Sequence, residues 1–342
     1  MAKINIRSPY FINVYDSQVN LESAKLDLYV YTGTQITNRG TIKYTLNSTA
    51  YDNRVTFEIS ELVRDYLDIT FDGNYDSQMV WVDYQVTEYV NTSSYTLTTQ
   101  NLEAFNGYGY FEDGVQNQST EINTGDLLQS NTIQYILKDE ILKVPVNVND
   151  IVDVTFYKEG YSNSVSCTDT TSSNSLIKYT SDVANIDRVV VNNGTTTTEI
   201  DIEIIEECKH TPYKITFVNK FGALQDLWFF KRSNLSLSTK KETYKSNILN
   251  SGSYSINDHQ TKVLNKQGSE KLVLNSGFVN EEYNEVFRQL MLSEKVWIDY
   301  DSKTLPINIS SSSLNYKTNL NDKMINYTIN VDFAFNKINS VR

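Results

Sequence analysis

The sequence predicts an all-β, multi-domain protein, mainly β-sandwich or barrel domains with two short helices. Three observations support this fold class. The chain is rich in strand-favouring residues, with 24 Tyr and abundant Thr, Val and Ile. Apolar and polar residues alternate along many segments, and turn residues separate them about every 8 to 12 residues, as in sandwiches and barrels. At 342 residues the chain exceeds one typical core, so several domains are expected.

Residues 1–118 are predicted to form an N-terminal β-sandwich domain. Alternation of apolar and polar residues predicts strands with one buried and one exposed face. The apolar faces are Leu26, Leu28 and Val30; Ile42, Tyr44 and Leu46; Val55, Phe57 and Ile59; and alternate residues from Met79 to Val90. One helix is predicted at Glu61 to Leu67, with Ser60 as its N-cap.

The next boundary is predicted from a loss of pattern. From Val115 to Asn131 the sequence is mostly Gln, Asn, Ser, Thr and Gly without periodicity, which indicates a connecting segment. We therefore assign residues 119–131 to a linker and residues 132–231 to a middle β domain of short strands.

Residues 232–342 are predicted to form a C-terminal β domain with one helix, 281–292. Turn-rich breaks are expected at Asn250 to Asp258 and at Asn265 to Glu270. For the helix, Asn280 is the expected cap, and acidic residues follow in the first turn. Its apolar face would comprise Tyr283, Val286, Phe287, Leu290 and Met291.

Charge and cysteine content restrict the function. The net charge of −12 opposes binding to nucleic acid or to an anionic membrane, because like charges repel. The first residues lack the apolar core of a secretion signal, so we expect no export. Cys167 and Cys208 are then expected to be free thiols in a reducing cytoplasm.

The motifs that carry chemistry are incomplete, and we predict no catalytic, cofactor-binding or metal-binding residues. Cys208 and His210 lack the second pair of ligands that a zinc site requires. The segment Asp72 to Asp76 begins like a calcium loop, but Ser77 and Asp83 stand where that loop needs Gly and Glu. The chain is therefore predicted not to be an enzyme.

Several segments resemble known virion proteins. Ile6 to Val14, Val55 to Leu67 and Gly107 to Gly114 resemble segments of tailed-bacteriophage virion proteins, particularly those of crAss-like phages. Near the end, Ile215 to Gly222 precedes an aromatic run, and a helix leads into Ser293 to Ile298. That arrangement is similar to tail-hub and distal-tail proteins, which form rings of β domains.

This resemblance implies a structural component of a tailed-phage virion, forming part of a ring or hub in the tail or neck. Its partners would be further copies of itself and other virion proteins, with no direct contact to nucleic acid or membrane. It would be assembled in the cytoplasm of the host bacterium and reside in the virion. An alternative is a receptor- or carbohydrate-binding appendage of the tail or head, in which Tyr and Trp stack on a host glycan. A hydrolase is a third class, and it would need a carboxylate pair brought together by the fold.

Candidate interface residues come from two places in the sequence. Ile4, Ile6, Tyr10 and Ile12 alternate with polar residues in a segment that has no turn-linked partner nearby. This segment could add as a strand to a neighbouring subunit, or it could pair within its own domain. Trp228 and Phe229, in the aromatic run, are the other two candidates, because aromatic residues fill interfaces as well as cores.

Overall fold

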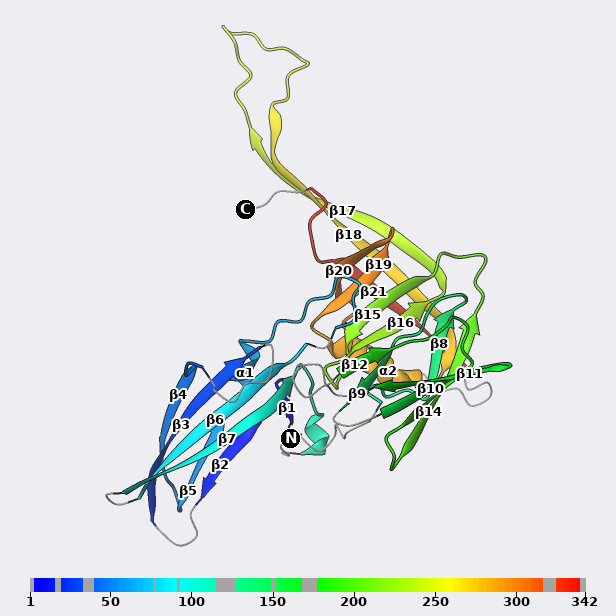
Figure 1. The fold of residues 1–342 in the computed structure, drawn as a ribbon. Coiled ribbons are helices and arrows are strands. Elements are labelled where there is room, and N and C mark those ends of the chain that lie inside the picture. Colours follow the sequence, from blue (N-terminus) through cyan, green and yellow to red (C-terminus); the bar gives the residue numbers. More distant parts are fainter. Residues whose placement is uncertain are drawn as a thin grey trace.

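A computed structural model shows an all-β protein with several sheets and two α-helices, which confirms the predicted fold class (Figure 1). The structure describes residues 3–15, 20–32, 40–76, 78–90, 93–114, 127–148, 152–167, 177–315 and 324–338. Most of the predicted linker, residues 119–126, lies outside this described part of the chain.

The N-terminal region folds into two layers around one core. A five-stranded sheet has the order β1 (Lys3–Asn5), β7 (Ser93–Phe105), β6 (Val80–Val90), β3 (Leu21–Tyr31) and β4 (Tyr44–Thr49). β2 (Phe11–Tyr15) pairs with β5 (Arg54–Glu58) as a second ribbon. Apolar residues of both layers join in a single core, because each strand turns alternate residues inward.

The middle region contains two further sheets. One has the order β11 (Tyr161–Cys167), β10 (Val152–Lys158), β13 (Arg188–Asn192), β14 (Thr197–Ile205) and β8 (Ile133–Leu137). The other pairs β12 (Ile177–Thr180) with β9 (Val144–Asn147). Cys167 is buried and Cys208 exposed, and both are free thiols, as predicted.

The C-terminal region is a seven-stranded sheet. Its order is β16 (Leu224–Phe229), β15 (Tyr213–Val218), β19 (Val296–Tyr300), β20 (Lys303–Ile309), β21 (Met324–Phe333), β18 (Thr261–Asn280) and β17 (Lys231–Lys245). β15 and β16 thus pair with C-terminal strands, although the predicted boundary at 231 assigns them to the middle domain. One apolar core runs through both regions, so the division between them stays a prediction.

The two predicted helices are present, with shifted starts, and the first ends at Arg64, three residues before the predicted Leu67. α1 (Ser60–Arg64) begins at Ser60 itself, whose hydroxyl donates to Glu58 instead of capping the helix. α2 (Tyr283–Leu292) begins after Glu282, because Asn280 still belongs to β18. The Asn280 side chain accepts a hydrogen bond from the Glu282 backbone N–H at 3.2 Å, within the turn that joins the two elements. A short 3₁₀ turn, η1 (Phe111–Asp113), is the remaining helical element of the described residues.

The N-terminal region contacts the C-terminal sheet at several places, and one of them is the loop that follows β7. Tyr108 donates its backbone N–H to the Lys220 carbonyl at 2.8 Å, and Gly107 forms a β-bridge with Phe221. Arg64 forms an ion pair with Glu294 at 2.7 Å on the rim of this joint. A separate apolar cluster packs residues 69–75 on β15, β16 and β19, so backbone bonds, a salt bridge and apolar contacts hold the two regions together.

One predicted break is wrong. Asn265 to Glu270 was expected to be a turn but lies inside β18, the longest strand of the structure's described residues. Its partner there is β17, with Lys241 opposite Lys266 and Leu237 opposite Glu270. The polar run is a strand because it pairs with β17 along its whole length, although only its outer residues, Asn265 and Lys266, are exposed. The second expected break, Asn250 to Asp258, does form the turn-rich end of this hairpin.

Candidate interaction arm

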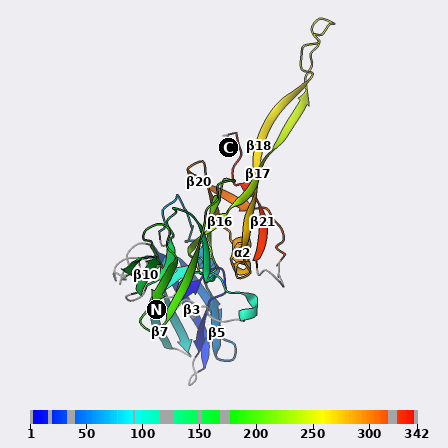
Figure 2. The same ribbon diagram turned by 90° about the vertical axis from the view of Figure 1, so that its right-hand side faces the viewer.

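The hairpin of β17 and β18 leaves the sheet and projects away from the rest of the protein (Figures 1 and 2). β21 pairs with β18 only from Lys271 to Asn280, whereas β17 pairs with β18 as far out as Lys245. Outward of Lys271 the ribbon therefore has two strands and no third. We call residues 231–271 the arm. β17 has 15 residues and, at about 3.3 Å per residue, is roughly 50 Å long.

Local sequence explains how the hairpin closes. Asn250 and Ser253 form a β-bridge across Ser251 and Gly252, and both central residues have positive φ, +49° and +84°. Two successive positive φ values define the type I′ turn, whose twist matches that of paired strands. The pairing shifts register by one residue at Glu242 and Thr243, so Leu264 is an extra residue in a bulge.

The arm exposes apolar side chains. Every residue from 242 to 265 is exposed except Ser246 and Ile248, which are half-buried. Of 23 exposed large apolar side chains in the described chain, eight belong to the arm: Leu235, Leu237, Tyr244, Leu249, Tyr254, Ile256, Val263 and Leu264. Ile256 is 89% exposed and Leu264 70%. Because an isolated two-stranded ribbon is only marginally stable in water, a ribbon of this kind is typical of an element that packs on a partner.

Charge on the arm is opposite to that of the rest of the chain. Residues 231–271 contain eight Lys or Arg and three Asp or Glu, a net charge of +5. The whole chain carries −12, so the remaining residues carry −17. The basic residues therefore form a local feature that the overall composition conceals.

The base of the arm is fixed by ion pairs, and its outer part is not. Lys231 contacts Glu207 at 2.7 Å, and Lys271 contacts Asp332 at 3.3 Å. By contrast, the five outer lysines form no ion pair with any residue that the structure describes: Lys240, Lys241, Lys245, Lys262 and Lys266. The outer arm is thus a basic, partly apolar ribbon held out from an anchored base.

The six predicted interface residues lie inside the folded chain. Ile4 and Ile6 are at most 1% exposed, and Tyr10 and Ile12 are also buried in the N-terminal core. β1 pairs in parallel with β7 and β2 pairs with β5, so the first segment completes its own domain. In the described fold these four residues form no exposed surface.

The two aromatic candidates are buried as well. Trp228 stacks on Phe230 with ring centroids 6.2 Å apart, and Phe229 meets Phe287 edge to face at 6.1 Å. Both belong to the core shared by the middle and C-terminal regions. The strand that carries them, β16, pairs with β15 of the same chain, just as β1 and β2 pair within the chain.

Sequence reasoning missed the arm, although two signals of it are present. The first is the local excess of Lys and Arg between 231 and 271 in an acidic chain. The second is the spacing of Leu235 and Leu237, which alternate with polar residues and continue into a lysine-rich stretch. Charge summed by segment would have identified the arm.

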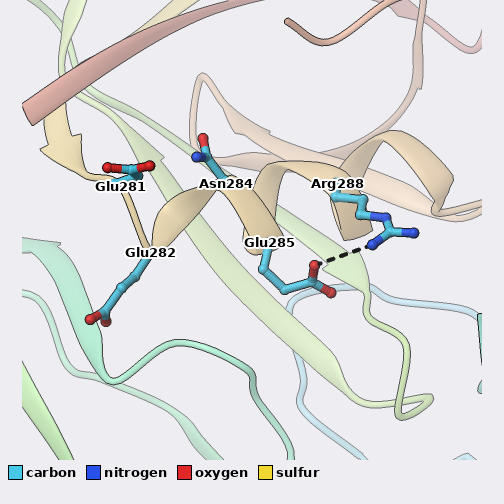
Figure 3. A pocket seen from close by; sticks show the side chains of 5 residues that line it. All are labelled: Glu281, Glu282, Asn284, Glu285 and Arg288. Atoms are coloured by element: carbon cyan, nitrogen blue, oxygen red, sulfur yellow. Dashed lines mark ion pairs between the residues drawn. The ribbon is translucent and has the colours of Figure 1, made fainter. Parts of the chain in front are cut away.

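A separate hollow of about 790 Å³ lies beside the start of α2 (Figure 3). Glu281, Glu282, Glu285 and Arg288 are the charged residues that line it. Arg288 is 2.9 Å from Glu112, and Glu285 accepts a hydrogen bond from the Tyr110 hydroxyl at 2.5 Å. Hydrogen bonding to Glu285 and burial raise the pKa of the Tyr110 phenol, with burial the larger cause. These contacts hold η1 against α2.

No group of three or more His, Cys, Asp or Glu side chains in the described residues is placed to hold a metal ion. Among the same residues, neither helix has the length and apolar character needed to cross a membrane. A comparison with protein-family models found no match, and neither did a comparison with curated proteins.

Proposed function

We propose that this chain is a non-enzymatic structural subunit of a tailed-phage virion, forming part of a ring or hub in the tail or neck through protein contacts made by its arm. The observation that carries the proposal is the projecting ribbon of residues 231–271 with eight exposed large apolar side chains. The sequence resemblance to virion proteins of tailed phages supplies the biological setting.

The energetics favour a partner for the arm. Burying one exposed side chain of the size of Leu, Ile or Tyr contributes about 1.5 to 3 kcal/mol. The outer arm carries six such side chains between residues 242 and 265, so partner contacts have a large gain available to offset the entropy of association. The body, meaning the chain outside the arm, contains two large apolar cores, which suit a rigid subunit of a ring.

The test compares two matched double variants in the purified protein. Tyr254→Ser with Ile256→Ser removes two apolar side chains from the arm tip. Tyr95→Ser with Leu97→Ser removes an equally spaced and similarly exposed pair from β7. We expect light scattering to show assemblies for the wild type and for the β7 variant, and smaller species for the arm variant.

Two results would contradict the proposal. Equal assembly by both variants would mean that the arm tip is not the contact. Binding of the monomeric wild type to a glycan array, lost in the arm variant, would instead favour the receptor- or carbohydrate-binding alternative, with Tyr244 and Tyr254 as stacking residues.

A further inference from the structure

We infer that the arm binds the acidic body of a second copy of this chain, in a head-to-tail contact between two different surfaces. This inference rests on the proposed function and goes beyond it by naming the partner, the chemistry and the symmetry of the contact. Its starting point is the separation of charge, with +5 on residues 231–271 and −17 on the remainder.

The acidic body of the same chain does not neutralise the positive charge of the outer arm. β17 and β18 remain paired out to Lys245 and Thr261, so the ribbon is extended, and both views show it directed away from the sheets (Figures 1 and 2). Glu242 and Asp258 are the acidic residues of the outer ribbon, beside five lysines, and none of these lysines forms an ion pair with a residue that the structure describes. The acidic body of another copy can supply the missing partners.

The arrangement of the lysines also destabilises the free arm. Lys241 lies directly opposite Lys266 in the ladder, and like charges directly opposite each other destabilise a strand pair. Lys240 precedes Lys241 in β17 and adds to the positive field, and Glu242 on the other side offsets part of it. Acidic side chains of a partner would remove this repulsion, which makes the arm more stable when bound than when free.

The same charges exclude the simplest alternative contact. β17 is an edge strand, and two arms could in principle pair edge to edge. That arrangement would bring two lysine-rich ribbons together, and lysines on edge strands oppose such pairing. A body with a net charge of −17 instead attracts the arm, and its field speeds encounter.

A contact between two different surfaces has a defined consequence for symmetry. Each copy offers one arm and one body, so every copy can bind two neighbours. Repetition of such a contact gives a ring if the rotation closes, and a filament if it does not. A closed assembly of this kind is a ring of three or more copies or a dimer in which two copies exchange arms, and an open one is a filament.

The decisive experiment uses an arm-truncated variant of the full chain. Residues 242–265 are replaced by Asn-Gly, which joins Lys241 to the directly opposite Lys266 through a two-residue type I′ turn. This variant keeps its body and loses the outer arm. We expect tagged truncated protein to capture the wild type but not untagged truncated protein. Failure to capture the wild type would overturn the inference, because the truncated variant keeps the body that the arm of the wild type should bind.

Charge is tested with a matched pair of double variants. Lys240→Glu with Lys241→Glu should weaken association by about tenfold, since each reversed surface pair has a modest effect and two add. Lys209→Glu with Lys303→Glu alters the net charge equally on exposed positions of the body and should not weaken association, because it makes the body more acidic. Raising salt from about 0.1 M to about 1 M shortens the screening length from about 10 Å to about 3 Å and should weaken the wild type similarly. The inferred electrostatic contact would be wrong if both pairs of substitutions changed association equally, or if salt had no effect on association.

The outcomes separate this inference from the proposed function. A truncated variant that neither assembles nor captures the wild type would contradict the inference and leave the proposed function, because the arm would then be needed but would not bind the body. A wild type that stays monomeric and binds duplex DNA through Lys240 and Lys241 would overturn both, and would make the arm a nucleic-acid contact.

Discussion

Removal of one buried amide should destabilise the joint between the N-terminal region and the C-terminal sheet. Asn219 is fully buried at the start of the joining loop. Its side-chain N–H groups donate to the Leu128 carbonyl at 2.7 Å and to Gln225 at 3.0 Å. Its oxygen accepts from the backbone N–H groups of Phe221 at 3.0 Å and Ala223 at 3.1 Å. Asn219→Ala deletes all four bonds and leaves four polar groups without their partner.

Each buried polar group that loses its partner costs about 1 to 3 kcal/mol, and water entering the vacated space recovers part of this. We therefore expect Asn219→Ala to lower the free energy of unfolding by about 3 kcal/mol or more, measured by urea titration followed by circular dichroism. The control is Asn192→Ala, which removes one exposed turn bond to the Gly194 N–H and should cost about 0.5 kcal/mol. A loss below about 1 kcal/mol for Asn219→Ala would show that this amide network does not secure the joint.

Three further predictions concern stability. Ile4→Ala should cost about 2 to 5 kcal/mol by denaturant titration, since it leaves a cavity in the N-terminal core, and a cost near zero would mean that the first segment is not in that core. The hydrogen bond from Lys231 lowers the pKa of Glu207 from 4.5 to about 2, so Glu207 stabilises the fold above pH 4.5 and loses that effect as pH falls toward 2. The stability difference between wild type and Glu207→Gln should shrink across that range, and a constant difference would refute the assignment. Gly222→Ala should lower the melting temperature, because φ is +77° and the new Cβ would lie 3.0 Å from the Asn106 backbone nitrogen; an unchanged melting temperature would count against a close approach there.

Local patterns predicted the elements that have one buried face. The alternation from Met79 to Val90 gave β6 because its apolar residues reach a core. The helical spacing of Tyr283, Phe287 and Leu290 gave α2 for the same reason. The spacing of apolar residues reflects which side chains face the core, so it predicts an element correctly where one face of that element is buried.

The sequence could not show which distant strands pair. Ile4 seemed to lack a partner because β7, which pairs with it, lies about a hundred residues later in the chain. The sequence around Trp228 does not indicate that the core shared by the middle and C-terminal regions buries this side chain. The outer arm shows no apolar period because residues 242–265 are almost all exposed and face no core. Asn265 to Glu270 resembled a turn because its residues are polar or Gly, although Gly268 is buried.

Electron micrographs of the purified full-length protein, taken beside the variant in which Asn-Gly replaces residues 242–265, would show directly whether the arm joins one copy to the body of the next. We expect closed rings for the full-length protein, with each arm crossing onto the body of its neighbour, and single particles for the truncated variant. Rings of the same diameter from both proteins, or single particles from both, would contradict this expectation.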